Sequence, residues 1–406
     1  MGKPKIRFKG YEDDWEQRKL DNVAEFSKGR GYSKGDLIEL GTPIILYGRL
    51  YTNYETSISD VDTYVEAKDG SVYSRGGEVI VPASGESAED IARAATVDKS
   101  GILLGGDLNV VMPNEDINSG FLAISISNGN PQRELAKRAQ GKSVVHIHNE
   151  EIRNLRVPFP IKVEQNKIVE YFFNLDHLIT LHQRKCEETK SLKKYMLQKM
   201  FPENGKCVPK IRFSGFSDAW EQRKLDGWGT FYYGRSCPKW SVTEDATIPC
   251  IRYGELYTKF GAKIDRVYSY TNMPPENLRF SKGTEVLIPR VGEDPMDYNH
   301  CTWLSMPDVA IGEMISVFNT DNNPLFTATM FNATLQNEFA MRVEGGSVTN
   351  LYFEKLKNIE VSFPSIQEQE KIAAYFENLD HLITLHQHKC DELQKLKKFM
   401  LQNMFV

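Results

Sequence analysis

The chain has 406 residues, of which 40% are hydrophobic, 11% aromatic and 26% charged, and its formal net charge is −5. This composition is ordinary for a folded protein and excludes disordered, fibrous and polybasic, histone-like classes. The six cysteines form no CxxC pair and are predicted to be reduced thiols. The basic N-terminus is not followed by an apolar stretch, and no run approaches roughly eighteen apolar residues. We therefore expect a cytoplasmic protein of two or more domains without a membrane span.

The first element is PKIRFKGYEDDWEQRKL (4–20), which returns as PKIRFSGFSDAWEQRKL (209–225) with 13 of 17 positions identical. We term these two stretches the lead segments. A second repeat ends each copy: NLDHLITLHQRKCEETKSLKKYMLQKMF (174–201) and NLDHLITLHQHKCDELQKLKKFMLQNMF (378–405) agree at 21 of 28 positions. The chain is therefore predicted to be two copies of one plan.

Short runs of β-branched and aromatic residues follow each lead segment, bounded by Gly, Pro and Asn, and these are predicted to be strands. In the first copy they are TPIILYGRLYTNY (42–54), GGEVIVP (76–82) and GFLAISISN (120–128). In the second copy they are TIPCIRYGELYTKF (247–260), GTEVLIP (283–289) and PLFTATMFN (324–332). The stretches between these runs differ completely. Two domains are thus predicted to share a strand framework and to carry different loops, where recognition usually resides.

A long helix is predicted to close each copy. VPFPIKVEQNKIVEYF (157–172) and VSFPSIQEQEKIAAYF (361–376) place a Pro ahead of a long stretch without Gly or Pro. Apolar residues then recur at alternating three- and four-residue steps, the pattern of an a/d seam, over roughly 35–38 residues. The predicted seam residues are Ile168, Leu175, Leu178, His182, Ile372, Leu379, Leu382 and His386. The helices are predicted to pair antiparallel, with positions 175, 178 and 182 facing positions 379, 382 and 386.

These elements predict an α+β fold, in which two pseudo-symmetric globular domains are separated by an antiparallel pair of long helices, a coiled coil. The predicted globular domains cover 1–160 and 205–364. The predicted helical spacers cover 161–204 and 365–406.

The order of a variable domain, a long helix beginning near FPxxxEQxKI, a PKIRFxGFxDxWEQRKL-like lead segment, a second variable domain and a second helix resembles the specificity subunit of type I restriction-modification systems. The resemblance covers essentially the whole chain. It implies two target-recognition domains, each reading one half of a bipartite, asymmetric double-stranded DNA target. It implies that the helices set the gap and dock two DNA-methyltransferase subunits, which restriction (translocase) subunits join. It also implies a subunit without catalytic activity or cofactors, since S-adenosylmethionine, ATP and Mg would belong to the partner subunits.

Side chains that can read base edges gather in the loops that differ between the copies. Those loops as a whole are a better indicator of the DNA-contacting surface than any single residue in them. The predicted DNA-contacting residues are Ser84, Glu86, Arg93, Lys99, Asn128, Asn130, Gln132, Arg133 and Arg138 in the first domain, and Arg235, Lys239, Trp240, Arg290, Glu293, Asn299, Asn332, Gln336 and Asn337 in the second. Because phosphate contacts usually need a basic surface, the net acidity predicts weak DNA binding by the isolated chain. RELAKRAQGK (133–142) is a local basic cluster.

Three stretches resemble enzyme or metal sites. AKRAQGKS (136–143) fits a relaxed phosphate loop, but a helix-like segment precedes it and a strand-like one follows, the inverse of the working order. NPLF (323–326) resembles the Asn-Pro-Pro-aromatic motif of amino-methyltransferases, but its third residue is Leu, which favours a turn into a strand. His182 and Cys186, with His386 and Cys390, could form a Cys2His2 zinc set, although a histidine that fixes coiled-coil register is the favoured interpretation.

Two other classes of function stay open at this point. A scaffold or adaptor that binds protein partners is compatible with long helices but gives no reason for two divergent loop sets on one framework. An enzyme acting on nucleic acid would need paired carboxylates or a set of metal ligands, whereas GGD (105–107) offers one isolated acid. The sequence therefore favours a DNA-recognition subunit without catalytic activity.

Overall fold

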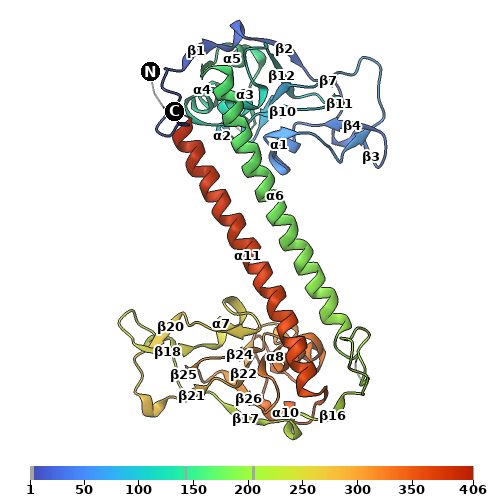
Figure 1. The fold of residues 1–406 in the computed structure, drawn as a ribbon, viewed down its shortest axis with the longest axis vertical. Helices are drawn as coiled ribbons and strands as arrows, with labels where there is room; N and C mark the ends of the chain where they lie inside the picture. The colour runs from blue at the N-terminus through green and yellow to red at the C-terminus, as the bar shows by residue number, and fades with distance from the viewer. Residues whose placement is uncertain (1–3, 142–143, 204–205, 406) are drawn as a thin grey trace. The chain divides into compact units, whose positions relative to one another are not determined.

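A computed structural model describes residues 4–141, 144–203 and 206–405 (Figure 1). The contacts divide the chain into two compact units. Unit 1 holds the residues up to Gln183 and those from Gln387 onward, and unit 2 holds Arg184–His386. The two long helices, α6 (Lys162–Lys199) and α11 (Ile366–Met404), each contribute one end to each unit. Their lengths of 38 and 39 residues confirm the predicted long helices, whereas the boundaries at 160, 204 and 364 stay a prediction.

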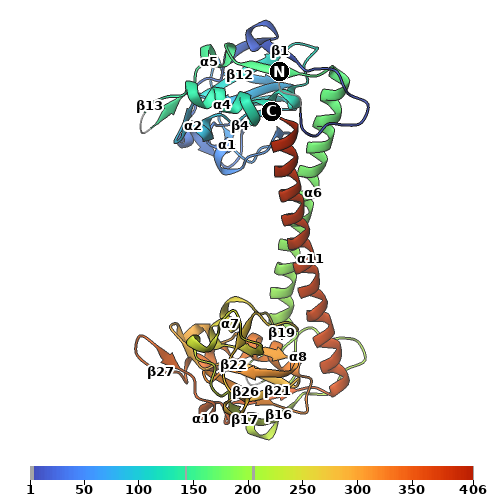
Figure 2. The same cartoon turned by 90° about the vertical axis from the view of Figure 1, so that its left-hand side faces the viewer.

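Unit 1 is built on two five-stranded sheets, ordered β2-β12-β8-β10-β5 and β3-β6-β4-β11-β7. Two smaller sheets, β1-β15 and β13-β14-β9, lie beside them. The strands are β1 (Glu16–Lys19), β2 (Ala24–Lys28), β3 (Leu37–Ile38), β4 (Thr42–Ile45), β5 (Ser57–Ile58), β6 (Tyr64–Val65), β7 (Tyr73–Arg75), β8 (Glu78–Pro82), β9 (Ser84–Gly85), β10 (Ala95–Val97), β11 (Ser100–Leu104), β12 (Leu108–Pro113), β13 (Gln140–Gly141), β14 (Val145–His146) and β15 (Arg156–Phe159). Figure 2 shows β13 at the margin of the unit.

Five short helices complete unit 1, and the core forms where two of them meet α6. They are α1 (Arg49–Thr52), α2 (Ala88–Ile91), α3 (Ser119–Ile126), α4 (Gly129–Arg138) and α5 (Asn149–Arg153). Phe121 of α3 and Phe172 of α6 are fully buried in one cluster with Leu393 and Phe405 from the C-terminal end of α11. The core of unit 1 therefore combines residues that are almost three hundred positions apart in sequence.

Unit 2 repeats this plan with one sheet shortened. Its sheets are β17-β26-β22-β24-β19, β20-β18-β25-β21, β16-β29 and β23-β28-β27. The strands are β16 (Glu221–Lys224), β17 (Thr230–Tyr233), β18 (Ile248–Ile251), β19 (Lys263–Ile264), β20 (Ser269–Thr271), β21 (Phe280–Lys282), β22 (Glu285–Pro289), β23 (Val291–Gly292), β24 (Thr302–Leu304), β25 (Pro307–Ile311), β26 (Ile315–Asn319), β27 (Glu344–Gly345), β28 (Thr349–Asn350) and β29 (Glu360–Phe363). The helices are α7 (Tyr253–Thr258), α8 (Pro324–Thr334), α9 (Gln336–Ala340) and α10 (Phe353–Leu356). Phe201, at the end of α6, is buried here with Phe326 and Phe376.

Each lead segment is clamped to the first turn of a long helix by a buried ion pair. In unit 1, Arg7 Nε and Nη2 donate to the two carboxylate oxygens of Glu164 at 2.7 and 2.8 Å. In unit 2, Arg212 does the same to Glu368, at 2.7 Å for both bonds. Both carboxylates are almost fully buried, at 0 and 1% side-chain exposure. This clamp explains why an arginine in the lead segment and a Glu-Gln pair in the helix recur together.

The glutamine of that Glu-Gln pair binds the N-terminus of a shorter helix in the same unit, α3 in unit 1 and α8 in unit 2. Gln165 Oε1 accepts the backbone N–H of Asn118 at 2.8 Å, and Gln369 Oε1 accepts that of Asn323 at 2.9 Å. Asn118 and Asn323 are the N-caps of α3 and α8, and each side-chain oxygen accepts a backbone N–H inside the helix. Helix, clamp and cap thus form one connected frame in each unit.

Two of the predicted strands are wrong, since residues 120–128 and 324–332 lie mainly in the helices α3 and α8. Both helices are buried on nearly every side, so their residues are apolar without helical periodicity and could not be told from a buried strand. The predicted strands at 42–54 and 247–260 are correct only in their first part, where they form β4 and β18, and they continue into the helices α1 and α7. By contrast, residues 78–82 and 285–289 form the central strands β8 and β22 as predicted.

The seam is also corrected in part. Leu178 and Leu382 are each 40% exposed, so their predicted inward placement is wrong, while the next residue, Ile179, is buried at 8%. Leu175 belongs to the core cluster of unit 1 that includes Leu393 of α11, and Leu379 belongs to the core cluster of unit 2 that includes Met200 from the end of α6. The predicted facing of positions 175 and 379 is therefore wrong, because antiparallel pairing places each beside the opposite end of the other helix.

Ion pairs show the same antiparallel order. Asp176 pairs with Lys397 in unit 1, and Asp380 pairs with Lys193 in unit 2. Cys207, Cys237, Cys250 and Cys301 are free thiols, as predicted. In the described parts of the chain, none of the helices is both long and apolar enough to cross a membrane.

Candidate nucleic-acid interface

Several of the predicted DNA-contacting residues of unit 1 bind other parts of the unit. Arg93 Nη1 donates to the Leu50 carbonyl at 3.1 Å, and Asn128 Nδ2 donates to the Ile124 carbonyl at 2.8 Å. Arg138 Nη1 donates to the Glu151 carbonyl at 3.2 Å, while Lys99 pairs with Asp60. Ser84 is buried in β9, with its Oγ 3.1 Å from His146 Nδ1. Glu86 and Asn130 are exposed. Part of this set therefore holds the fold as well as facing outward.

Four of those residues come together around two adjoining cavities of unit 1. Arg93, Asn128 and Gln132 line a cavity of about 240 Å³ together with Lys397. Asn128, Gln132 and Lys397 also line a second cavity of about 690 Å³. That cavity adds Arg133, Lys5 and Lys398. We term the two cavities the α4–α11 groove.

Sequence reasoning missed the three lysines of this groove. They come from the first lead segment and from the end of α11, almost four hundred positions apart in sequence, and the antiparallel fold alone brings them beside α4. The sequence does carry a signal in the KLKK run at 395–398, but a charge run on a helix is usually a solvated face.

The predicted DNA-contacting residues of unit 2 also divide into residues that bind other parts of the unit and residues that are exposed. Asn299 Nδ2 donates to the Asn332 carbonyl at 3.2 Å, and Asn332 makes two hydrogen bonds of 2.7 Å with the backbone of Cys301. Gln336 Nε2 donates to the Met296 carbonyl at 2.8 Å. Arg290 lies over the Tyr233 ring, 4.9 Å from its centroid. Arg235, Lys239, Trp240, Glu293 and Asn337 are exposed.

Trp240 is the most exposed aromatic side chain of unit 2, at 72%. It lies in a 3-10 turn, residues 239–241, which is joined to β20 by a hydrogen bond of 2.7 Å between Ser241 Oγ and Thr271 Oγ1. Tyr268 and Tyr270, before and within β20, are 42 and 43% exposed. Aromatic rings beside cations are typical of surfaces that bind nucleic acid. Sequence reasoning named Trp240 and Lys239 but missed the two tyrosines.

Cations lie close to these rings. Lys259 Nζ is 5.2 Å and the Arg266 guanidinium carbon 5.1 Å from the centroid of the Tyr268 ring.

Burial and a hydrogen bond of 2.7 Å to Glu354 raise the pKa of Tyr233 to about 12, so its hydroxyl is a neutral donor at pH 7. Burial also raises the pKa of Tyr232.

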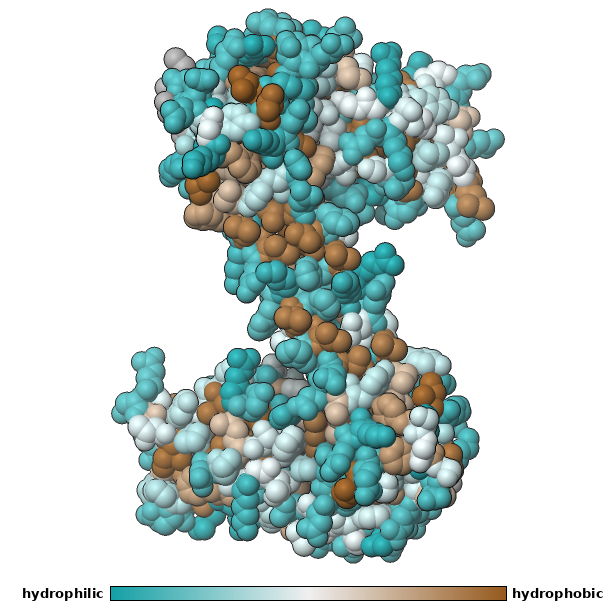
Figure 3. All heavy atoms as spheres, viewed as in Figure 1, coloured by the Kyte–Doolittle hydropathy of each residue, from teal (hydrophilic) through white to brown (hydrophobic). Residues whose placement is uncertain are grey.

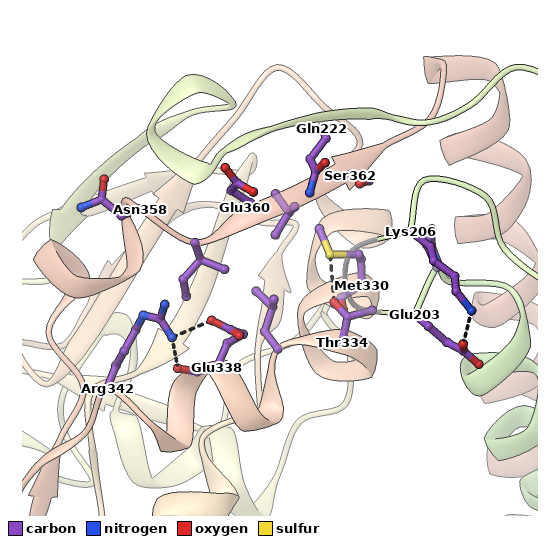
Figure 4. Close-up of a pocket in the computed structure, with 14 residues that line it drawn as sticks. Glu203, Lys206, Gln222, Met330, Thr334, Glu338, Arg342, Asn358, Glu360 and Ser362 are labelled. Atoms are coloured by element: carbon purple, nitrogen blue, oxygen red, sulfur yellow. Dashed lines mark hydrogen bonds and ion pairs between the residues drawn. The ribbon is translucent and has the colours of Figure 1, made fainter.

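A third cavity, of about 350 Å³, lies in unit 2 and has mixed charge (Figure 4). Its lining includes the carboxylates of Glu203, Glu338 and Glu360 and the cations of Lys206 and Arg342. Arg342 pairs with Glu338 at 2.6 Å, and Lys206 pairs with Glu203 at 2.7 Å. The cations are thus neutralised within the cavity, and an excess of carboxylate remains that would repel a phosphate.

The enzyme-like stretches gain no support. Asn323 of NPLF accepts the Phe326 N–H at 2.9 Å as a helix cap, so its side chain holds α8 and does not face a base. The turn leads into a helix, and the predicted strand after it is wrong. In AKRAQGKS, the first three residues are the end of the helix α4, so a helix comes first as expected, while Lys142 and Ser143 lie outside the described residues. Within residues 4–141, 144–203 and 206–405, no three His, Cys, Asp or Glu side chains are grouped as metal ligands.

Comparison with known proteins gives a consistent result. A family model described as the type I restriction modification DNA specificity domain matches residues 12–191 and 308–395. A relative from Methanocaldococcus jannaschii, named as the MjaX specificity subunit of a type I restriction enzyme, is 24% identical over 95% of this chain and 91% of its own length. The crystal structure of a type I restriction-modification S subunit from M. genitalium is 15% identical, with a TM-score of 0.63 over 100% of this chain and 99% of that one. A structure from work on complex assembly of the type I system is 16% identical, with a TM-score of 0.50 over 97 and 98% of the two chains.

Proposed function

Because this chain belongs to the type I restriction modification DNA specificity family, we propose that its two units read the two different halves of one bipartite, asymmetric double-stranded DNA target. One observation carries this proposal: the units share a frame but not their exposed edges. The sheet β20-β18-β25-β21 of unit 2 has four strands and is joined to the turn that carries Trp240, whereas the matching sheet of unit 1 has five strands. Identical edges would fit a palindrome, and different edges fit two unlike half-sites.

The long helices set the gap between the half-sites and dock two DNA-methyltransferase subunits in this proposal. Apolar side chains on both helices support it, because 40 to 53% of their surface is exposed to solvent. In unit 1 they are Leu178, Leu396 and Phe399, and in unit 2 they are Leu192, Tyr195, Leu382 and Leu385. Figure 3 shows hydrophobic side chains gathered over the helices. Exposed apolar patches of this kind mark protein interaction sites, and their repetition in both units fits one methyltransferase subunit for each.

This chain performs no catalytic step in the proposed complex. Methyltransferase subunits supply S-adenosylmethionine chemistry, and restriction (translocase) subunits use ATP and Mg on the assembled complex. Such a complex acts on DNA in the bacterial cytoplasm as part of defence against foreign DNA. A scaffold without DNA recognition is not favoured, because the family is defined by a DNA specificity domain.

Exchange of residues 21–157 for the matching part of a related chain tests the proposal. The chain is co-expressed with its methyltransferase partner, and methylated bases are mapped across the genome. We expect one half of the methylated sequence to change while the other half and the gap are kept. A simultaneous change of both halves would overturn the two-reader proposal, and methylation without any fixed motif would overturn DNA recognition by this chain.

A further inference from the structure

The α4–α11 groove of unit 1 has a one-sided charge. Among the described residues that line it are five cations and no Asp or Glu. The cations are Lys5, Arg93, Arg133, Lys397 and Lys398. By contrast, the cavity of Figure 4 is lined by three glutamates and two cations. The groove is therefore a pocket of positive potential on a chain whose net charge is −5.

Two of the five cations are already compensated by carboxylates beside the groove. Lys397 pairs with Asp176, which also accepts a hydrogen bond of 3.2 Å from Thr56 Oγ1. Arg93 lies 3.5 Å from Asp90. These ion pairs hold Lys397 and Arg93 in place and neutralise most of their positive charge.

The other three cations face a different situation. Among the described residues, no carboxylate lies within 4 Å of Lys5 Nζ, Lys398 Nζ or the Arg133 guanidinium, whose Nη2 donates to the amide oxygen of Asn130 at 2.8 Å. All three side chains are exposed. The first turn of α4 lines the same cavity and adds the partial positive charge of a helix N-terminus. Within the part of unit 1 that the structure describes, these three cations around one cavity therefore have no carboxylate counter-ion.

The matching positions of unit 2 differ, although the frame is the same. Lys210 occupies the position that corresponds to Lys5, but it forms an ion pair with Glu203. Asn337 stands in place of Arg133, while Lys194 keeps the charge of Lys398, so of the three matching positions two keep a lysine and one of these lysines is already paired. The groove is thus a property of unit 1 and not a by-product of the repeat.

We propose that the α4–α11 groove binds the phosphates of the DNA backbone, and that Lys5, Arg133 and Lys398 are positioning residues that anchor the duplex to unit 1. The proposal rests on the proposed function, since it assumes that the complex binds DNA. Three cations without an acid suit a run of phosphodiesters, which repeat one charge per about 3.4 Å of each strand. The groove reads no base, so it adds affinity without sequence information.

The test uses the full chain assembled with its methyltransferase subunits and a duplex that carries the methylated motif. The double variant Arg133→Gln with Lys398→Gln removes two charges from exposed side chains, so the fold is retained. Loss of two phosphate contacts is expected to make the slope of log K against log salt shallower by roughly 1.8, because each contact contributes roughly 0.9. The methylated motif is expected to stay the same. The matched control is Lys194→Gln in unit 2, for which the slope is expected to change by less than half of that.

Four outcomes would overturn the proposal. The first is an unchanged salt slope for the double variant in an intact complex. The second is loss of methyltransferase assembly, measured by native mass spectrometry, with normal DNA binding by whatever complex forms, which would show that an acidic segment of the partner occupies the groove. The third is a wild-type complex that binds no bipartite motif, which would remove the proposed function itself and this proposal with it. An altered slope that Lys194→Gln reproduces in full would assign the effect to general charge and also overturn the specific site.

Discussion

Units 1 and 2 agree where they meet the long helices and differ where they face away from them. In both units an arginine of the lead segment clamps a buried glutamate, and a phenylalanine at a helix end enters an aromatic cluster. Their outer edges share no such detail, since Trp240 stands where the first unit has Gly35. Selection on the frame concerns buried charge and shape, which tolerate little change, whereas exposed side chains can be replaced at little cost in stability. The comparison therefore predicts equal effects of matched substitutions in the frame.

The clamp should give the largest effect. Replacement of Arg212 by alanine leaves the carboxylate of Glu368 buried without its partner, which is expected to lower the free energy of unfolding by about 3–5 kcal/mol. Arg7→Ala should cost unit 1 about the same. Urea denaturation of the full chain, followed by tryptophan fluorescence, measures both. The control is Arg223→Ala, whose exposed ion pair with Glu221 should contribute less than about 1 kcal/mol. An equal loss of unfolding free energy for Arg212→Ala and for the control would contradict a stabilising role of the buried ion pair.

The aromatic clusters at the helix ends should give the next effect. The Phe405 ring lies 5.7 Å from Phe121, and the Phe201 ring lies 5.7 Å from Phe326, measured between centroids. Either change to alanine is expected to cost about 3 kcal/mol, the low end for a buried phenylalanine, because a helix end can relax into the space. Phe399→Ala, at a side chain that is 53% exposed, is the control and should change stability by less than about 0.5 kcal/mol. A large loss for Phe201 with none for Phe405 would break the equivalence of the units.

The glutamines that hold the caps should give a smaller effect. Gln369→Ala removes the acceptor for the Asn323 N–H and leaves buried backbone groups unpaired, at a cost of about 1–2 kcal/mol. Gln165→Ala should behave alike in unit 1. Thermal unfolding measures the change, with the exposed Gln367→Ala as the control. A melting temperature for Gln369→Ala equal to that of the control would show that water replaces the lost hydrogen bonds.

The frame could be predicted from the sequence much better than the interface. Repetition made both long helices visible, but α3 and α8 were mistaken for strands, because a helix buried on all sides shows no periodicity. Leu178 satisfied the spacing of a seam, yet two helices that also pack on globular domains turn Ile179 inward. The three lysines of the α4–α11 groove could not be grouped, since their proximity depends on tertiary contacts between distant segments. The choice of DNA-contacting residues stays a prediction.

The smallest effect concerns pH and sharpens the difference between Lys5 and Lys210. Hydrogen bonds from Lys206 and Lys210 lower the pKa of Glu203 to about 2 from an ordinary 4.5. A depressed carboxyl pKa stabilises the folded state above 4.5, and this contribution is lost as pH falls towards 2. Because these side chains are exposed, water screens the pairs and the change is small. Carbon NMR of the side-chain carboxyl should give the low pKa directly, and Glu203→Gln should reduce the acid sensitivity of unit 2 alone. An ordinary pKa for Glu203 would mean that Lys210 is as uncompensated as Lys5, and the charge contrast between the two units would then rest on Arg133 and Asn337.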